Sequence, residues 1–428
     1  MPPSEPLQNL LWPRHDPISN DSHLVNSMNQ AVDLHFQEGS RAQAIDIFRG
    51  LNVLAMIFVD NLGFVAGLPW WTYHMPADAN GMTYVDMVFP AFLFLMGMSV
   101  PFSMGSRIAK GQTKPQLWMH VVMRSVSLVA LGLFVSNAPQ VDAQRTGMSS
   151  PTWAALGFVA IALVWIDFPG RVKHQAISGV LRFCGFALLI SLAVIFRRAN
   201  ADVRAAWLDF SDWEILGLLG WAYLSVSVIY LLFERKVAVL ASALGVLIAI
   251  NALSAAGRLS WIASLPPYLR PFEAGLSSLT MAGLLVSLLL GSNEFAPTFR
   301  KKVWWGLIFA AILFAVGYLL RPLGISKIRD TPTWCLYCMS ANTLIALLLC
   351  WIADIKGWTK WAGFAKPVGR NPLLSYFLPY VAYFSPGLFR LTADGTSGLH
   401  GVARSLLFTG LILVIVTLLN GAKIKLRL

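Results

Sequence analysis

About twelve apolar windows, each roughly 17–25 residues long, follow one another along this chain and limit what it can fold into. A helix of that length crosses the hydrocarbon core of a bilayer, where the backbone must satisfy its own hydrogen bonds. The sequence therefore predicts an all-α, polytopic integral membrane protein with about 12 transmembrane helices (about 10–12). The windows lie near residues 50–68, 84–105, 119–137, 151–167, 176–196, 214–233, 237–256, 274–291, 303–320, 333–354, 371–389 and 402–420.

The composition agrees with this prediction. Hydrophobic residues make up 56% of the chain and charged residues 13%, against about 45–50% apolar and about 25% charged in soluble domains. The net charge of +12 is interpreted as a topology signal, so membrane lipid and no nucleic acid is expected as a partner. Cys335 and Cys338 have the spacing of a redox motif, but without a second pair they are expected to be small apolar helix residues, and no metal site is predicted.

The distribution of Lys and Arg predicts the orientation. If the N-terminus is cytoplasmic and the spans alternate, 22 of the 33 Lys and Arg residues fall on the inner side. That excess favours an N-in, C-in topology. Residues 1–40 are then a polar cytoplasmic N-terminal tail without a signal-peptide pattern, and residues 41–428 form the transmembrane domain.

Polar residues gather in the first outer loop, where residues 73–90 read YHMPADANGMTYVDMVFP. Asp60 and Asn61 stand near the outer end of the first span and Asp86 opens the second, so topology brings all three toward the surface that carries His74. A histidine flanked by a carboxylate or an amide has the tunable pKa and held tautomer of a general base. A loop histidine at headgroup level, and an Asp86 that only favours the positive end of a helix, are the simpler interpretations.

Four basic residues occupy the inner ends of the first three spans and are candidate ligands for the phosphates of an anionic cofactor: Arg49, Arg107, Lys110 and Arg124. The positive-inside rule with snorkelling side chains is the simpler explanation of their positions. Asp46 and Arg49, three residues apart, are expected to pair on one helix face.

A second group of polar residues comes late in the chain. Lys327 and Trp334 belong to a stretch that enters the tenth span from outside, where Lys327 is a candidate contact for a polar or anionic substrate or a solvated cation. Asn371, followed by Pro372, opens the eleventh span from inside and is expected to cap that helix.

Two stretches resemble a known family. RAQAIDIFRGL at 41–51, an outer-loop histidine, and NGMTYVDMVFPAFLFLMG at 80–97 are similar to the heparan-α-glucosaminide N-acetyltransferase family of transmembrane acyltransferases. Residues 324–334, 354–358 and 369–371 follow in similar order and spacing. The resemblance implies that acetyl-CoA is taken from the cytoplasmic side and that its acetyl group passes to a sugar amine or hydroxyl on the far side.

The resemblance also implies roles for single residues, with His74 at the position of the family's essential histidine. The implied catalytic residues are His74, Asp60 and Asn61. The candidate substrate-binding residues are Asp86, Asn80, Lys327, Trp334 and Asn371, and the candidate donor-binding residues remain Arg49, Arg107, Lys110 and Arg124. Acetyl-CoA would be the co-substrate without a metal, the acceptor a saccharide, and the location a bacterial cytoplasmic (inner) membrane as a multi-pass protein. The oligomeric state stays open, with a homodimer as one option.

The chain departs from the family pattern at two places. Five residues, Met75 to Ala79, separate the histidine from Asn80, where the family usually has three, and Asp60-Asn61 stands where the family has one asparagine. Two alternatives therefore stay open: a multi-span transporter of a small polar or sugar-like solute, and a non-catalytic member of the acyltransferase fold. Whether His74 acts as a base or as a covalent acyl carrier is also open.

Overall fold

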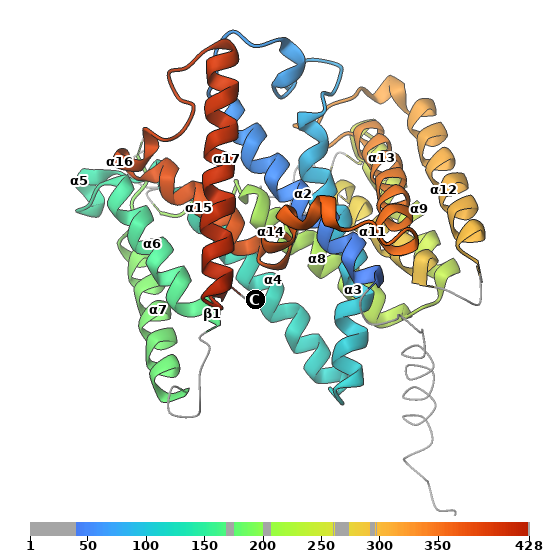
Figure 1. Ribbon diagram of the computed structural model, residues 1–428, viewed down its shortest axis with the longest axis horizontal. Coiled ribbons are helices and arrows are strands. Elements are labelled where there is room, and N and C mark those ends of the chain that lie inside the picture. Colours follow the sequence, from blue (N-terminus) through green and yellow to red (C-terminus); the bar gives the residue numbers. More distant parts are fainter. Residues whose placement is uncertain are drawn as a thin grey trace, which may run out of the picture.

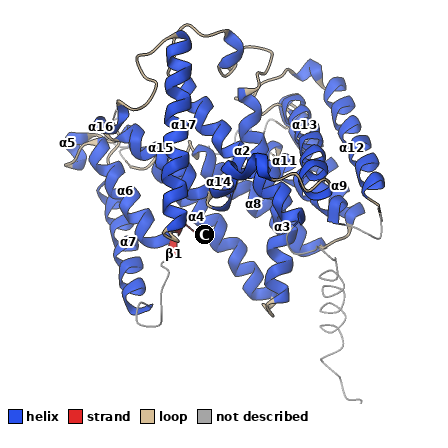
Figure 2. Ribbon diagram, viewed as in Figure 1, coloured by secondary structure: helices blue, strands red, loops and turns tan. Residues whose placement is uncertain are grey.

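The computed structural model describes residues 40–167, 175–199, 207–259, 261, 274–291, 296 and 298–426. These segments are almost entirely helical (Figure 1, Figure 2), which confirms the all-α prediction. Their one small sheet joins β1 (Ile166–Asp167) to β2 (Lys425–Leu426) in antiparallel register. The predicted tail, apart from residue 40, lies outside the described residues.

Every predicted apolar window overlaps a helix, although the window 50–68 begins ten residues inside the first helix and ends six residues beyond it. The long helices are α2 (Ser40–Leu62), α3 (Val88–Ala109), α4 (Lys114–Asn137), α6 (Ser150–Trp165), α7 (Gln175–Ile195), α8 (Glu214–Phe233), α9 (Val237–Ala255), α11 (Gly275–Gly291), α12 (Phe299–Leu319), α13 (Pro332–Cys350), α15 (Pro372–Phe384) and α17 (Gly398–Gly421). The short helices and turns are η1 (Trp70–Thr72), η2 (Val85–Met87), η3 (Ala138–Gln140), α5 (Ala143–Thr146), η6 (Arg321–Leu323), η7 (Trp351–Ile355), η8 (Lys360–Ala365), α14 (Lys366–Arg370) and α16 (Pro386–Phe389).

Within the described residues, eight of these helices are long and apolar enough to cross a membrane: α3, α4, α7, α8, α9, α12, α13 and α17. The chain is therefore a multi-pass membrane protein by the length and composition of its helices. The predicted count of about twelve is larger because α6 and α11 are shorter apolar helices, because α2 carries Asp46, Arg49 and Asp60, and because α15 has only 13 residues.

Helix α2 is the central element of the fold. It packs against α3, α13, α14, α15 and α17, while α6 and α7 lie at one side of the molecule and α12 and α13 at the other (Figure 1). A Cβ atom at Gly50 would meet the backbone of Ala365, and one at Gly369 would meet the backbone of Asp46. Backbone contact therefore fastens the first half of α2 to α14 and the turn before it.

Helices α3 and α11 also cross in backbone contact. A Cβ atom at Gly97 would collide with the carbonyl group of Thr280, and one at Gly283 would collide with the carbonyl group of Phe94. Small residues let membrane helices approach this closely, since dispersion contacts replace the hydrophobic effect inside a bilayer. This crossing fixes the position of α3, and the turn at the start of α3 carries Asp86.

Candidate functional site

The loop between α2 and α3, residues 63–84, carries His74 and is held in shape by its own polar groups. The Tyr73 hydroxyl donates to the Val65 carbonyl at 2.6 Å and accepts a hydrogen bond from the Leu68 N–H at 3.1 Å. The Thr83 hydroxyl donates to the Tyr73 carbonyl at 2.9 Å. Because Thr83 lies at the entry to η2, this bond places His74, the next residue after Tyr73, against the start of α3.

His74 and Asp86 form a hydrogen-bonded pair. His74 Nδ1 lies 2.7 Å from Asp86 Oδ1, and the Asp86 side chain is 1% exposed whereas that of His74 is 43% exposed. Asp86 Oδ2 accepts from the N–H groups of Thr83 at 3.0 Å and Met75 at 3.3 Å. Because an ionised carboxylate can only accept, the neutral imidazole carries its proton on Nδ1 and presents the lone pair of Nε2.

Trp334 secures the backbone of the same aspartate. Its indole Nε1–H donates to the Asp86 carbonyl at 3.2 Å, and the side chain is fully buried at 0% exposure. The bond ties the first turn of α13 to η2. Trp334 therefore fixes the backbone of Asp86, while His74 contacts its side chain.

A second loop, between α12 and α13, closes over His74. Asn80 Oδ1 accepts a hydrogen bond from the Ile325 N–H at 2.8 Å, and the Gly81 N–H donates to the Ile325 carbonyl at 2.9 Å. These bonds bring Lys327 Nζ to 3.3 Å from His74 Nε2 and 3.4 Å from His74 Nδ1. The near-equal distances show that the amine is not aligned with either nitrogen alone.

Burial lowers the pKa of Lys327, and the negative charges of Asp86 and Asp60 act in the opposite direction. Burial is the larger effect. The amine of Lys327 is thus easier to deprotonate than that of a solvated lysine, and it faces an imidazole rather than a carboxylate.

Asp60 and Asn61 are neighbours in α2 but have different surroundings. Asp60 lies within electrostatic reach of His74 and Lys327. Asn61 is fully buried at 0% exposure, and its Oδ1 accepts from the N–H of Ala393 at 2.9 Å and the hydroxyl of Ser405 at 3.3 Å. Among the residues that the structure describes, no hydrogen bond joins Asn61 to His74, so Asn61 fastens α2 to α17.

An acid–tyrosine cluster near Asp60 was not predicted. Glu214, the first residue of α8, accepts through Oε1 from the hydroxyls of Tyr376 and Tyr380, the latter at 2.8 Å. Its Oε2 accepts from the Leu216 N–H at 2.9 Å. Asp60 lies within electrostatic reach of both Glu214 and Tyr380. The two tyrosines are four residues apart on α15, and that spacing on one helix face was the available sequence signal.

At the opposite end of the bundle, Arg49 is hydrogen-bonded to three protein groups. Its guanidinium donates to Asp46 Oδ1 at 3.2 Å, to Ser99 Oγ at 2.8 Å and to the Gly369 carbonyl at 3.3 Å. The predicted Asp46–Arg49 pair is confirmed. Arg49 therefore joins α2, α3 and α14 to one another.

Arg124 on α4 lies beside two polar residues of α8, Tyr223 and Ser227, and these three residues form a polar seam between the two helices. Its guanidinium carbon lies 4.8 Å from the ring centre of Tyr223. In the described part of the chain, Arg124 Nε, the Tyr223 hydroxyl and the Ser227 hydroxyl are buried without a hydrogen-bond partner. Buried polar groups are normally paired, so these three atoms are free to form hydrogen bonds with a polar ligand or water.

Arg107, Lys110 and His120 complete the basic surroundings of this seam. The charges of Arg107 and Arg124 both act on His120, which lies one helical turn before Arg124. Arg107 donates to the Gln112 side chain at 3.3 Å, and Lys110 is exposed just after α3. His120 was left out of the predicted site, although its i, i+4 spacing from Arg124 pointed to it.

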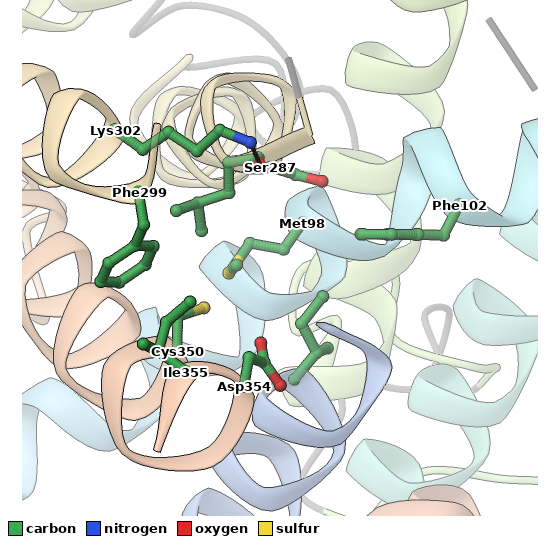
Figure 3. A pocket seen from close by; sticks show the side chains of 10 residues that line it. Met98, Phe102, Ser287, Phe299, Lys302, Cys350, Asp354 and Ile355 are labelled. Carbon is green, nitrogen blue, oxygen red and sulfur yellow. Dashed lines mark hydrogen bonds between the residues drawn. The ribbon is translucent and has the colours of Figure 1, made fainter. Parts of the chain in front are cut away.

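A small, partly open pocket with a cavity volume of about 30 Å³ lies beside the second half of α3. Figure 3 shows Lys302, whose Nζ donates to the Leu290 carbonyl at 2.8 Å, and Asp354 on different parts of its wall. Met98 and Phe102 supply apolar lining from α3. The cavity combines an apolar surface with one buried cation and one anion, and no sequence pattern predicted it.

Asn371 lies at the N-cap position of α15 with Pro372 as the first helical residue, but its side chain makes no capping hydrogen bond. Its Nδ2 donates to Asn420 Oδ1 at 3.1 Å and to the Ile424 carbonyl at 3.0 Å. The expectation that its side chain caps the helix was wrong, because Oδ1, the atom that would accept from the first N–H groups of α15, accepts from the Leu426 N–H at 3.3 Å instead.

Together these features define a multi-pass α-helical membrane protein in which a histidine–aspartate pair lies at the loop-bearing end of a helix bundle. The family model described as "Domain of unknown function (DUF5009)" matches residues 41–265, more than half of the chain, and the chain belongs to this family.

Two curated relatives are similar to shorter parts of the chain. Heparan-alpha-glucosaminide N-acetyltransferase of Mus musculus is 35% identical over 124 residues, 29% of this chain and 17% of that protein. Heparan-alpha-glucosaminide N-acetyltransferase of Homo sapiens is 37% identical over 97 residues, 23% of this chain and 14% of that protein. The matches confirm the resemblance seen in the sequence, and the matched segment spans less than a fifth of either relative's length.

Proposed function

We propose that this protein is a membrane-embedded acetyltransferase that moves an acetyl group from cytoplasmic acetyl-CoA to an extracytoplasmic sugar amine or hydroxyl. The observation that carries the proposal is the His74–Asp86 pair, in which a buried carboxylate holds Nδ1 at 2.7 Å and leaves Nε2 available. The similarity to two N-acetyltransferases supports the reaction class.

The pair supplies the chemistry that acyl transfer to an amine or hydroxyl requires. The lone pair of the acceptor amine or hydroxyl attacks the thioester carbonyl while His74 Nε2 takes the acceptor's proton. Asp86 stabilises the imidazolium that forms. The carbon–sulfur bond then breaks and the proton passes to the leaving thiolate. A second route, in which Nε2 attacks first and forms an acetyl-imidazole, uses the same geometry. General-base catalysis of this kind contributes about 10²- to 10⁴-fold in rate.

The other residues at this end shape the acceptor site. Asp60 lies within electrostatic reach of the imidazole and Lys327 borders it, so these two would contact the sugar. Asn80 and Trp334 act through the loops and helices that they fasten. Asn61 would hold α2 against α17 rather than touch the acceptor.

The donor site is proposed at the opposite end, and the residues there fit a polyanionic thioester. Arg107, Lys110 and Arg124 would hold the phosphates, since guanidinium and ammonium groups bind phosphate oxygens by charge-assisted hydrogen bonds. The hydroxyls of Tyr223 and Ser227, which have no hydrogen-bond partner among the described residues, would accept hydrogen bonds from polar atoms of the donor or donate to them. Arg49 would orient α2 beside this site, because its donors already reach three protein acceptors.

This reaction requires a defined topology. We place the N- and C-termini in the cytoplasm, with α2, α6, α11 and α15 completing a twelve-span domain in a bacterial cytoplasmic membrane. Residues 1–40 would then form a cytoplasmic tail. Asn371 would lie at the cytoplasmic end of α15, away from the acceptor.

The test is an assay of the purified full-length protein in detergent or lipid nanodiscs with labelled acetyl-CoA and a panel of amino sugars. Release of CoA and an acetylated sugar are expected, and His74→Ala should abolish both. His400→Ala is the matched control, because His400 is an exposed histidine at the start of α17. Sugar uptake into vesicles that does not depend on acetyl-CoA, without any product, would instead indicate a transporter.

A further inference from the structure

Lys327 is held in place by a rigid turn. Ser326 and Thr331 flank it in sequence and are 2% and 4% exposed. The Thr331 N–H donates to the Ser326 carbonyl at 3.1 Å, and the Ser326 N–H donates to the Thr331 hydroxyl at 2.9 Å. Because Ile325 is bonded to the His74 loop as well, the position of the Lys327 amine is set by two loops at once.

The amine at this position has the surroundings of a nucleophile. Its nitrogen lies 3.3 Å from His74 Nε2, the atom that would accept a proton in the proposed reaction. No carboxylate lies within ion-pair distance of it in the part of the chain that the structure describes. Burial lowers the pKa of the amine, while Asp86, Asp60 and Cys338 raise it more weakly, and a neutral amine is the form that attacks a carbonyl.

We propose that Lys327 is a self-acylation site, modified by the acyl thioester that the protein uses as its donor. This inference rests on the proposed function, because it requires the same thioester at the same imidazole. The Lys327 amine would occupy the place of the acceptor amine whenever no sugar is bound.

The chemistry balances without a further reagent. The lone pair of Lys327 Nζ attacks the thioester carbonyl, an N–C bond forms, and the C–S bond breaks. One Nζ proton passes to His74 Nε2 and from there to the leaving thiolate, which gives acetyl-lysine and free CoA. An amide is a poor acyl donor, so the modification persists and removes the amine from the acceptor site.

The test is incubation of the full-length protein with acetyl-CoA in the absence of sugar, followed by peptide mass spectrometry. One acetyl group on Lys327 that resists hydroxylamine is expected, and its occupancy should exceed that of the exposed lysines Lys356 and Lys360. Hydroxylamine removes an acyl group from imidazole, so it separates this product from an acylated His74.

Two variants give the inference its specificity. His74→Ala should reduce acetylation of Lys327 to the occupancy of the exposed lysines, and Lys327→Arg should remove the modified peptide altogether. His74→Gln provides a second substitution, and size-exclusion chromatography of each variant reports correct folding. His400→Ala should leave the acetylation of Lys327 unchanged.

Several outcomes would overturn the inference. Equal labelling of Lys327 and the exposed lysines, or labelling of Lys327 that survives His74→Ala, would show ordinary chemical acetylation. Transfer to a sugar without any acetyl-lysine at 327 would overturn the self-acylation alone. The absence of both sugar transfer and CoA release would overturn both proposals. His74-dependent acetylation of Lys327 without sugar transfer would support the inference and contradict only the proposed sugar acceptor.

Discussion

Asn80 accepts a hydrogen bond from the backbone N–H of Ile325 at 2.8 Å, although 245 positions separate them in the sequence. This contact, with the reciprocal bond from the Gly81 N–H to the Ile325 carbonyl, makes one structure of two loops. One loop carries His74 and the other carries Lys327. The distance between imidazole and amine therefore depends on these two bonds to Ile325, of which one is made by a side chain.

Replacing Asn80 should loosen this junction. Asn80→Ala removes the acceptor for the Ile325 N–H, which costs about 0.5–1.5 kcal/mol of stability. Acetyl transfer should fall and the KM for the sugar should rise, because the two loops no longer define one site. Gln144→Ala, at an exposed residue of α5, is the control. Unchanged kinetics in Asn80→Ala would show that the loops hold their positions without this bond.

Replacing Asp86 with Asn should disable His74 without removing its side chain. The new amide can donate to Nδ1, which favours the tautomer with its proton on Nε2 and takes away the base. The rate of acetyl transfer should fall about 10²- to 10⁴-fold. Measurement of kcat with melting temperature separates this effect from unfolding, and a variant with full kcat would exclude Asp86 as the partner of the base.

Lys327 should make stability depend on pH. Burial lowers its pKa in the folded protein relative to the unfolded chain, so between the two values the unfolded chain binds the extra proton. Stability therefore rises with pH from the folded pKa up to the ordinary lysine value of about 10.4. Lys327→Met removes this group, and its melting temperature should exceed that of the wild type most at low pH.

The pH series for Lys327→Met needs a matched comparison. Lys356→Met replaces an exposed lysine and should follow the wild-type curve across the same pH range. A constant difference between wild type and Lys327→Met at every pH would contradict the lowered pKa, because it would show no proton linkage at this residue.

Tyr223 should contribute to donor binding. Tyr223→Phe deletes a buried hydroxyl that has no protein partner in the described residues, so the fold should lose little stability. Loss of one hydrogen bond to the donor, worth about 0.5–1.5 kcal/mol, corresponds to an increase of about 2- to 13-fold in the KM for acetyl-CoA. Tyr318→Phe, at an exposed tyrosine of α12, is the control.

The effect of replacing Glu214 on the stability of the fold should depend on which residue takes its place. Glu214→Gln keeps an oxygen that can accept from Tyr376 and Tyr380, whereas Glu214→Ala leaves both hydroxyls without it. An orphaned buried group costs about 1–3 kcal/mol, so the alanine variant should melt at the lower temperature. Equal melting temperatures would show that water or the Tyr376–Tyr380 contact replaces the carboxylate.

The helices of this protein were predictable from the sequence. The window 214–233 coincides with α8, and its neighbour 237–256 differs from α9 by one residue. Bilayer thickness sets the length of a span, so an apolar window gives the approximate position of a helix, although polar residues at the ends of α2 (Ser40–Leu62) displaced its predicted window, 50–68. The Asp46–Arg49 pair was predictable for the same kind of reason, because helical spacing alone brings the two side chains together.

The geometry of the candidate site was only partly predictable. Topology placed His74 and Asp86 at one surface, but their 2.7 Å contact depends on the irregular loop 63–84, whose path has no periodic signal. Lys327 and His74 are 253 positions apart, and Glu214 and Tyr380 are 166 apart. Pairings of this kind come from tertiary packing, which local sequence patterns do not contain. Arg49 illustrates the converse, since its charge suggested a ligand and packing gave it protein partners.

The close packing of α3 against α11 at their crossing controls how precisely Asp86 is positioned relative to His74. Gly97 is 11 residues from Asp86 along the chain, a lever arm of about 16 Å at helical rise. A tilt of α3 by about 5° about that crossing would swing Asp86 by about 1.4 Å over such an arm, and a displacement of about 1 Å can cost 10²-fold in rate. The small size of Gly97 in the middle of the bundle thus governs the alignment of Asp86 with His74 at the end of the bundle.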